Sequence, residues 1–408
     1  MAVALAIFLF TYLLILGQKI PFVPLDRPSG AATGAVLMVI CGVVAPEEVY
    51  REAVHHETLV LLLGMMILSS YLAEAGFFRW ASWKAIHAAK TPRRLLAGVT
   101  LVCAGLSALL VNDTVCLMVT PLVLRVVEDA DLPPLPFLLA VAFGANAGSA
   151  ATPIGNPQNM IVATLSGIPF AEFTLALAPA ALVATLVVLG VLLVLFRREL
   201  APRRLAPAHV GAPAVDVPLL RRSLFALAAV AVAFFAGADL AWTAMTGAAF
   251  LLLVGGRPPR RALEQVDWIL LLFFAGLFVV VYGVGKTGAA DAIFGAVAPW
   301  ITGGPWREAA VLGTATVLLS NVFSNVPFVL LAAHWVPGFS DPALAWKVLA
   351  LTSTLAGNLT LVGSVANVIV FEIAGERGRI SFGGFLRYGL PATALATAAG
   401  TAVLLAMP

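Results

Sequence analysis

Residues 146–162 read NAGSAATPIGNPQNMIV, and residues 358–370 read NLTLVGSVANVIV. Both stretches lie inside long apolar segments, yet each gathers Gly, Asn, Thr and Ser, with Pro in the first, within a few positions. A helix that is interrupted in hydrocarbon exposes backbone N–H and C=O groups, and each unpaired group is costly there. Such a break persists only where protein, water or a ligand satisfies these groups. The two stretches therefore predict two broken membrane helices that line a polar site.

The composition is that of a membrane protein. Of the 408 residues, 61% are hydrophobic and only 11% are charged, whereas soluble domains carry roughly a quarter charged residues. The first apolar run, residues 2–18, has no basic residue before it and no small-residue cleavage site, so we interpret it as a membrane helix rather than a removable signal. We expect an all-α polytopic protein of the cell (inner or cytoplasmic) membrane, with multiple passes and no enzymatic cofactor.

Apolar runs of about 17 to 25 residues predict spanning helices. Two further regions, 95–127 and 308–335, are split by the polar clusters VNDT and SNVFSNVP. Each is either one helix with a polar face or two half-length helices that meet at a tip. Two others, 136–167 and 346–374, contain the opening stretches. The predicted unbroken spans are residues 2–18, 30–46, 57–76, 173–196, 222–238, 240–256, 267–285 and 386–406.

The Lys and Arg residues decide how the split regions cross the membrane. If 95–127 and 308–335 are re-entrant hairpins and 136–167 and 346–374 are broken but spanning, 20 of the 24 Lys and Arg fall on one side. Because cytoplasmic loops are enriched in these residues, we predict about 11 membrane elements plus two hairpins, with both termini outside the cytoplasm. The other side keeps Arg51, Lys286, Arg307 and Lys347.

Short sequence groups recur in the same order in the second half of the chain. With the topology above, the first hairpin enters from the cytoplasm and the second from outside, so the two halves are inverted. Inverted repeats with Gly-interrupted helices are typical of secondary transporters whose site lies near the membrane midplane. We predict an N-terminal repeat (1–196), a cytoplasmic linker (197–221) and a C-terminal repeat (222–408). The recurring groups are Ala32–Ala35 with Met245–Ala248 and Asn112 with Asn325, 213 positions apart, and Thr152, Gly155 and Asn159 with Thr360, Gly363 and Asn367, 208 apart.

The four polar clusters supply the candidate binding residues. Half-helix N-termini present N–H groups that suit an anion, and C-terminal ends present carbonyls that suit Na⁺. None of the clusters contains Lys or Arg, so dipoles, amides and hydroxyls, or accompanying cations, must hold an anion. The candidates are Asn112, Asp113 and Thr114; Thr152, Pro153, Gly155, Asn156 and Asn159; Ser324 and Asn325; and Asn358, Thr360, Gly363, Ser364 and Asn367.

Asp113 is the only carboxylate in these clusters. An acid within the membrane is a functional candidate, because an unused charge there is expensive. Asp113 coordinates Na⁺ or accepts a proton in this interpretation; the alternative is a tip residue that merely reaches water. The candidate ligands for a bound Na⁺ are Asn112, Asp113 and Asn325.

The order of these motifs is also that of a known superfamily. A split hairpin with Asn at its tip precedes the break TPIGNPQN, and a second hairpin with SNVFSNVP precedes the break TLVGSVAN. This order resembles the ion transporter superfamily, which includes divalent anion:Na⁺ symporters, citrate-type carriers, arsenite permeases and Na⁺/H⁺ antiporters. The run AGFFRWASWKAIHAAKTPRRLL followed by LLVNDT is similar to the arsenite permeases. The resemblance implies a homodimer whose hairpins and broken helices move elevator-fashion against a scaffold.

We therefore expect a secondary active transporter for a small anion, either an inorganic oxyanion or arsenite or a carboxylate, coupled to Na⁺ or H⁺. One alternative is a Na⁺/H⁺ antiporter that carries no anion. An ion channel shares re-entrant hairpins, but inverted halves with broken helices favour alternating access. No nucleophile, base and orienting residue can be assembled from the polar clusters, so we do not expect an enzyme. The expected partners are the substrate, the coupling ion, lipid and a second copy, and no nucleic acid, since the net charge is only +3.

Overall fold

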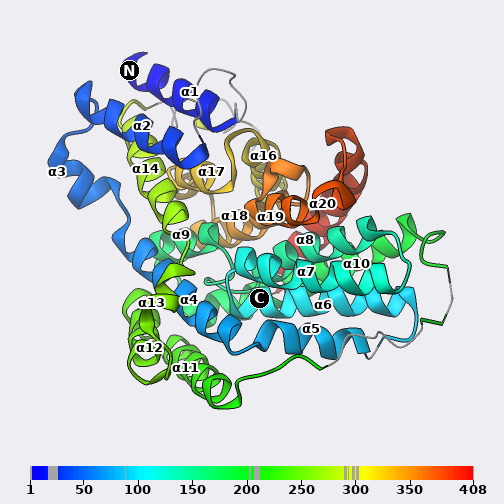
Figure 1. Ribbon diagram of the computed structural model, residues 1–408. Helices are drawn as coiled ribbons and strands as arrows, with labels where there is room; N and C mark the ends of the chain where they lie inside the picture. Colours follow the sequence, from blue (N-terminus) through cyan, green and yellow to red (C-terminus); the bar gives the residue numbers. More distant parts are fainter. Residues whose placement is uncertain are drawn as a thin grey trace.

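The part of the chain that the structure describes is mostly helical. The structure, a computed structural model, describes residues 2–16, 26–87, 89–201, 204–205, 212–288, 292, 294–295, 299 and 303–407, with the backbone alone at 16, 85 and 86. These residues form nineteen α-helices and no strand (Figure 1), which confirms the all-α class. The first half contains α1 (Ala2–Leu16), α2 (Arg27–Ile40), α3 (Pro46–Glu48), α4 (His56–Glu74), α5 (Phe77–His87), α6 (Pro92–Leu109), α7 (Asn112–Asp129), α8 (Pro134–Ser149), α9 (Pro157–Ser166) and α10 (Phe170–Leu195). The second half contains α11 (Val217–Phe235), α12 (Leu240–Val254), α13 (Pro259–Glu264), α14 (Trp268–Gly285), α16 (Pro305–Phe323), α17 (Asn325–Ala332), α18 (Pro342–Ala356), α19 (Val365–Ala374) and α20 (Phe382–Ala406).

Six of the described helices are long and apolar enough to cross a bilayer, namely α4, α6, α10, α11, α14 and α20. They confirm a multi-pass membrane protein. Five of them match predicted spans, and α6 is one arm of the first predicted hairpin. The remaining predicted spans correspond to the shorter helices α1, α2 and α12, and α2 ends at Ile40, before the predicted end at residue 46. The end of the first predicted span, residues 17–18, lies outside the described residues.

The start of α11 differs from the sequence interpretation. We expected a loop up to residue 221, because Arg221 and Arg222 interrupt the apolar pattern, but α11 begins at Val217. The Asp216 side chain accepts a hydrogen bond from the Leu219 N–H at 3.1 Å and so caps the helix. The two arginines therefore lie on the first turns of a helix.

The four polar clusters do interrupt helices. The first hairpin turns between α6 and α7, and the second between α16 and α17 at Ser324, whose φ of 70° is rare for a residue with a side chain. The first break separates α8 from α9 and the second separates α18 from α19. Helices α8 (16 residues) and α9 (10 residues) together have as many residues as α10 (26 residues). This length is expected if α8 and α9 are the two parts of one interrupted spanning helix.

The helices of the two halves pack reciprocally. Helices α2 and α4 of the first half correspond to α12 and α14 of the second at the offset of 213. Helix α2 packs against α14, and α4 packs against α12. Likewise α7 packs against the second broken helix at α19, and α17 packs against the first at α9. Such an exchange of partners is what a two-fold relation between the halves produces.

The helices form two groups that lie side by side in Figure 1. The α14 group consists of α1, α2, α4 and α11–α14, which pack on one another. The hairpin group consists of α6–α10 and α16–α20, which do the same. Helix α5 connects the groups and packs along α6 and α7, while the segment after α10 leads back to α11. The groups touch where α4 meets α7 and α9, where α14 meets α17 and where α10 meets α11.

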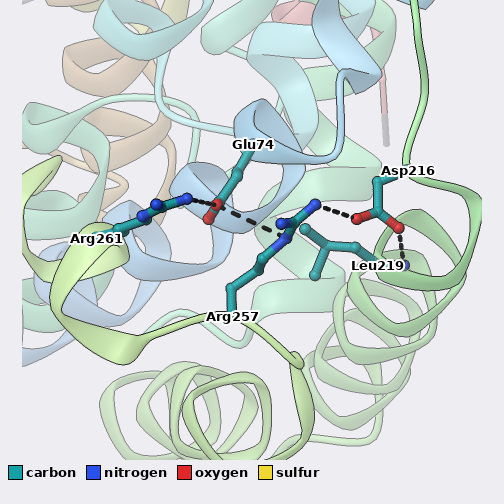
Figure 2. A network of polar contacts seen from close by, with 5 residues as sticks. All are labelled: Glu74, Asp216, Leu219, Arg257 and Arg261. Atoms are coloured by element: carbon teal, nitrogen blue, oxygen red, sulfur yellow. Dashed lines mark hydrogen bonds and ion pairs between the residues drawn. The ribbon is translucent and has the colours of Figure 1, made fainter.

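The segment that enters α11 is fixed to the α14 group by charged side chains (Figure 2). Arg257 lies 2.6 Å from the carboxylate of Asp216 and 3.9 Å from that of Glu74. Arg261 lies 4.0 Å from the same Glu74 oxygen. The hydrogen bond from the Leu219 N–H, and next to it the Arg257 guanidinium, hold the pKa of Asp216 below its usual range. This network anchors the end of the linker at the last turn of α4.

Candidate functional site

The first hairpin tip lies directly against the first break. The Asn112 N–H donates to the carbonyl of Gly155 at 2.9 Å. The Thr152 hydroxyl donates to the carbonyl of Ala108, at the end of α6, at 2.7 Å. The structure thus brings together two clusters that lie about forty residues apart in the sequence.

The second tip and break meet in the same way. The Thr360 hydroxyl donates to Asn321 Oδ1 at 2.8 Å, and Asn321 Nδ2 donates to the carbonyl of Ala356 at 3.0 Å. Thr360 and Asn321 are the counterparts of Thr152 and Ala108, so the contact is repeated with a side chain in place of a backbone carbonyl. Asn321 also fills the space beside Gly363, where a Cβ would lie 2.6 Å from its Oδ1.

Two asparagines satisfy carbonyls that the breaks leave open. Asn159 Nδ2 donates to the carbonyls of Ser149 at 3.2 Å and Thr152 at 3.1 Å. Asn367 Nδ2, 208 positions later, donates to the carbonyls of Gly357 at 2.7 Å and Thr360 at 3.0 Å. Both side chains are fully buried. Each amide replaces backbone hydrogen bonds that the break removes. This explains how a helix can be interrupted in an apolar environment.

Asn146 joins the first half to the second break. Its Nδ2 donates to Asn358 Oδ1 at 2.9 Å and to Asn367 Oδ1 at 3.0 Å. Its Oδ1 accepts from the Ser364 hydroxyl at 3.0 Å and from Asn112 Nδ2 at 3.1 Å. Four predicted candidates, one from the first tip and three from the second break, therefore meet at one buried side chain.

Thr354 joins the second half to the first break. Its hydroxyl accepts from Asn156 Nδ2 at 3.1 Å and donates to Asn159 Oδ1 at 3.2 Å. Thr354 is the counterpart of Asn146, and Asn156 and Asn159 are the counterparts of Ser364 and Asn367. The bonds of Thr354 to Asn156 and Asn159 are thus the two-fold counterparts of the bonds of Asn146 to Ser364 and Asn367.

The other candidates lie beside this network. Asp113 and Thr114 are partly buried on the first turn of α7, and the Asp113 carboxylate accepts no hydrogen bond from the described residues. Pro153 lies within the first break. At the second tip, Asn325 is 7% exposed, and its Oδ1 has no partner among the described atoms.

Sequence reasoning missed four members of the network. Asn146 and Ser149 stand in the opening stretch but were not selected, and Thr354 and Asn321 lie on the helices before the second break and the second tip. Asn146 and Thr354 occupy equivalent positions but differ in residue type, so a search for identical repeated residues passes over them. A search for any polar pair at the offset of 208 would have found them.

The network is polar but uncharged. Its described side chains are Asn, Thr and Ser, with Asp113 as the one neighbouring acid. Helices α7, α9, α17 and α19 all begin at this level, and the first N–H groups of a helix attract negative charge. The ends of α6, α8, α16 and α18 offer carbonyl oxygens, which attract cations. The arrangement therefore provides hydrogen bonds and both signs of partial charge.

Two cavities of about 570 Å³ each lie between the α14 group and the hairpin group, at opposite ends of α14. The first is lined by Phe273 of α14 and by Val365 of α19, which follows directly after Ser364 of the network. The topology predicted from the Lys and Arg residues would place this end at the cytoplasmic side. Its charged residues are Asp26, Arg27, Asp267 and Glu372.

The second cavity lies at the other, C-terminal end of α14. Tyr282 and Gly285 from the last turns of α14 face Leu165 of α9 and His334 after α17. The Tyr282 hydroxyl donates to Glu52 at 2.5 Å on the α14 side of this cavity. The boundary between the two groups is therefore hollow at both ends of α14.

Paired helical hairpins, paired broken helices and a hollow boundary between two helix groups define a membrane transporter. Comparison with known proteins identifies the family of transporters. The chain belongs to the citrate transporter family CitMHS, whose family model matches residues 12–356. This confirms the predicted superfamily and transport rather than enzymatic catalysis.

Relatives cover nearly the whole chain. It is 33% identical to the silicon efflux transporter LSI3 of Oryza sativa subsp. japonica, over 95% of this chain and 94% of that protein. It is 34% identical to the 46 kDa membrane protein of Mycobacterium leprae, over 97% and 96%. The crystal structure of the Alcanivorax borkumensis YdaH transporter matches with a TM-score of 0.57 at 14% identity, over 98% and 97% of the two chains. That last likeness concerns the fold alone.

Proposed function

We propose that the protein is a secondary active transporter that moves a small oxyacid or carboxylate across the cytoplasmic membrane, coupled to Na⁺ or H⁺, by elevator-type alternating access. The observation that carries the proposal is the buried network in which both broken helices and the first hairpin tip share hydrogen bonds. The network belongs to the hairpin group, which both cavities border. A ligand held there is exposed to one side or the other when that group shifts.

Neutral groups would recognise the substrate. The candidate residues offer amide and hydroxyl groups together with four helix N-termini, and a small oxyacid presents several hydroxyl or oxo groups to such a surface. Arsenious and silicic acids and small carboxylates all have this chemistry. The family name and the rice relative, a silicon efflux transporter, support the same range.

The charges of the cytoplasmic cavity narrow the range of possible substrates. Asp26, Asp267 and Glu372 line it together with one basic residue, Arg27. An excess of negative charge raises the local concentration of cations and lowers that of anions. A substrate that enters from this end is therefore best uncharged, as arsenious and silicic acids are near neutral pH, while Na⁺ or H⁺ is attracted. This feature favours an uncharged oxyacid over a dicarboxylate.

We assign cation coupling to the first tip. Asp113 is the only acid among the four clusters, and its carboxylate has no hydrogen-bond donor among the described residues. It would take up H⁺, or bind Na⁺ with Asn112; Asn325 is the corresponding candidate at the second tip. The same acid supports the second candidate function, a Na⁺/H⁺ antiporter without a co-transported substrate.

The two helix groups have separate roles in this proposal. The α14 group would be the stationary scaffold, also forming a homodimer, and the hairpin group would move with the substrate. Helix α5, the segment after α10 and the segment between α14 and α16 are the covalent connections that such a movement must accommodate. The anchoring of Asp216 to the α14 group fits a linker with one fixed end.

Transport in liposomes tests the proposal. Purified protein is reconstituted, and uptake of arsenite, silicic acid or citrate is followed with a pH gradient, a Na⁺ gradient or neither. We expect concentrative uptake of an uncharged oxyacid that requires one of the gradients. Na⁺-driven proton movement that needs no added substrate would support the antiporter instead, and a conductance without coupling would indicate a channel.

Asp113→Asn tests the coupling residue in the same assay. We expect gradient-driven uptake to fall by at least about tenfold, equivalent to about 1.4 kcal/mol, because Asn cannot bind and release a proton and offers a weaker cation ligand. Exchange of labelled for unlabelled substrate without a gradient should persist. The matched control is Asp129→Asn at the other, exposed end of α7, which should retain uptake. Unchanged gradient dependence in Asp113→Asn would exclude its coupling role.

A further inference from the structure

Asn146 uses its whole hydrogen-bonding capacity inside the protein. An amide side chain has two N–H donors and an oxygen with two lone pairs. Both donors are taken by Asn358 and Asn367 of the second broken helix, and both lone pairs by Asn112 and Ser364. Only 1% of Asn146 is exposed, so water does not compete for these bonds. Displacement of any partner leaves a buried polar group unsatisfied.

The equivalent residue of the second half makes no such connection. Thr354 bonds to Asn156 and Asn159, both of the first broken helix, and this uses its single hydroxyl. It does not bond to Asn325, which is the counterpart of Asn112. The first tip is therefore tied to the opposite break through Asn146, whereas the described residues show no such hydrogen bond from the second tip.

A continuous chain of hydrogen bonds results. The Asp113 N–H donates to Asn112 Oδ1 at 3.0 Å, and Asn112 Nδ2 donates to Asn146 at 3.1 Å. From Asn146 the chain reaches Asn358 and Asn367, and Asn367 in turn holds two carbonyls of the second break. In a buried network an unmade bond is costly, so a shift at one end favours a shift at the other.

We propose that Asn146 is a positioning residue that couples the state of the first hairpin tip to the geometry of the second break. This inference rests on the proposed function, since it is the cation at Asp113 that would change the state of the tip. The arrival of the cation would move Asn112, and Asn146 would transmit the movement to Asn358 and Asn367. The second half would then bind or release substrate in response to the first.

A double-mutant cycle tests this coupling without any ligand. Asp113→Asn changes the tip, and Asn146→Thr places in the first half the residue that the second half has at this position. Hydrogen–deuterium exchange is measured for peptides that cover residues 357–368 in the starting protein, the two single variants and the double variant. Asp129→Asn serves as the control for loss of a carboxylate on α7.

With Asn146 present, we expect Asp113→Asn to change exchange in residues 357–368 by about threefold or more. In the Asn146→Thr background, the same change at the tip should leave that segment unaffected, although its absolute exchange is faster. A merely structural role would raise exchange in both backgrounds and preserve the difference caused by Asp113→Asn. That preserved difference, or the absence of any response of the segment to Asp113→Asn, would overturn the proposal.

Asn112→Ala provides a second route if Asn146→Thr does not fold. This variant removes the hydrogen bond from Asn112 to Asn146 and leaves the hydrogen bonds of Asn146 to the second break in place. Asp113→Asn should then have no effect on residues 357–368, and a retained effect would overturn the proposal. Since the cycle contains no substrate, its failure is distinct from a failure of the liposome assay, which tests the proposed function.

Discussion

Gly148 on α8 has no room for a side chain. A Cβ there would overlap the backbone of Ala104 on α6, the first arm of the first hairpin. Because the obstacle is backbone, α6 and α8 must separate to admit a methyl group. We expect Gly148→Ala to lower stability by about 1–3 kcal/mol, measured as a lower melting temperature in detergent, and to loosen the contact between tip and break.

Gly105→Ala on α6 is the matched control. A Cβ at Gly105 meets nothing within 4 Å, and the residue lies in a helix, where Ala is favoured over Gly by up to about 1 kcal/mol. Its melting temperature should therefore stay the same or rise. Equal melting temperatures for the two variants would contradict the close packing of α6 on α8.

The candidate residues differ in how far the sequence could identify them. Asn159 and Asn367 stood out because they recur as the same residue in the same context, and the structure shows both holding carbonyls of their breaks. Asn146 and Thr354 did not, since equivalence of position does not require identity of side chain. Which asparagine meets which across the two halves depends on the packing of four helices, and no spacing within one half contains that information.

At the scale of helices, Asp216 provides a pH-dependent prediction. Its pKa is held below its ordinary value first by the Leu219 N–H and then by Arg257. A carboxylate with a lowered folded pKa stabilises the protein at pH above its unfolded pKa, about 3.9, and that contribution is lost as the pH falls through the folded pKa. We expect Asp216→Asn to melt at a lower temperature at neutral pH, with the difference vanishing in acid below the folded pKa.

Asp239→Asn is the control that separates the effect of losing the ion pair on stability from the effect of changing a helix cap. Asp239 caps α12 by accepting from the Trp242 N–H at 2.8 Å, and it has no ion pair among the described residues. Asn retains the capping oxygen in both variants. If the two substitutions lowered the melting temperature equally, the Arg257 contact would have no measurable role in anchoring the linker.

Helix boundaries were predictable where one residue type determines them. Asn156 caps the start of α9 by accepting from the Asn159 N–H, and Pro157 is suited to the first position of a helix. The start of α11 was missed because two arginines outweighed the Asp216 cap in the hydropathy pattern. The second hairpin is also less symmetric than its sequence suggests, since α17 has 8 residues and α7 has 18. Its apolar run continues past the end of the helix, so composition alone hides the difference.

For the molecule as a whole, the repeat was visible in the sequence but the exchange of partners was not. Recurring motifs establish two equivalent halves, yet they do not say whether α2 packs within its own half or against α14 of the other. The reciprocal packing divides each half between the two groups. The boundary between the groups therefore runs through both repeats rather than between them, and the proposed mechanism requires movement along that boundary.

A disulfide across this boundary tests the movement. Thr58 of α4 and Thr164 of α9 belong to different groups, and their hydroxyl oxygens lie 3.4 Å apart. In a background without the native cysteines, oxidised Thr58→Cys/Thr164→Cys should lose at least about tenfold of its gradient-driven uptake, and reduction should restore it. The cysteines to be replaced are Cys41, Cys103 and Cys116.

A second pair separates restraint of movement from the effect of a cross-link as such. Gly313 of α16 and Thr352 of α18 both belong to the hairpin group, and a Cβ at Gly313 would lie 4.0 Å from that of Thr352, which suits a disulfide. Because this bond joins helices that move together, oxidised Gly313→Cys/Thr352→Cys should transport normally. Full uptake by the oxidised Thr58–Thr164 pair would mean that α4 and α9 stay together during transport, and the boundary between the groups would then be a static contact.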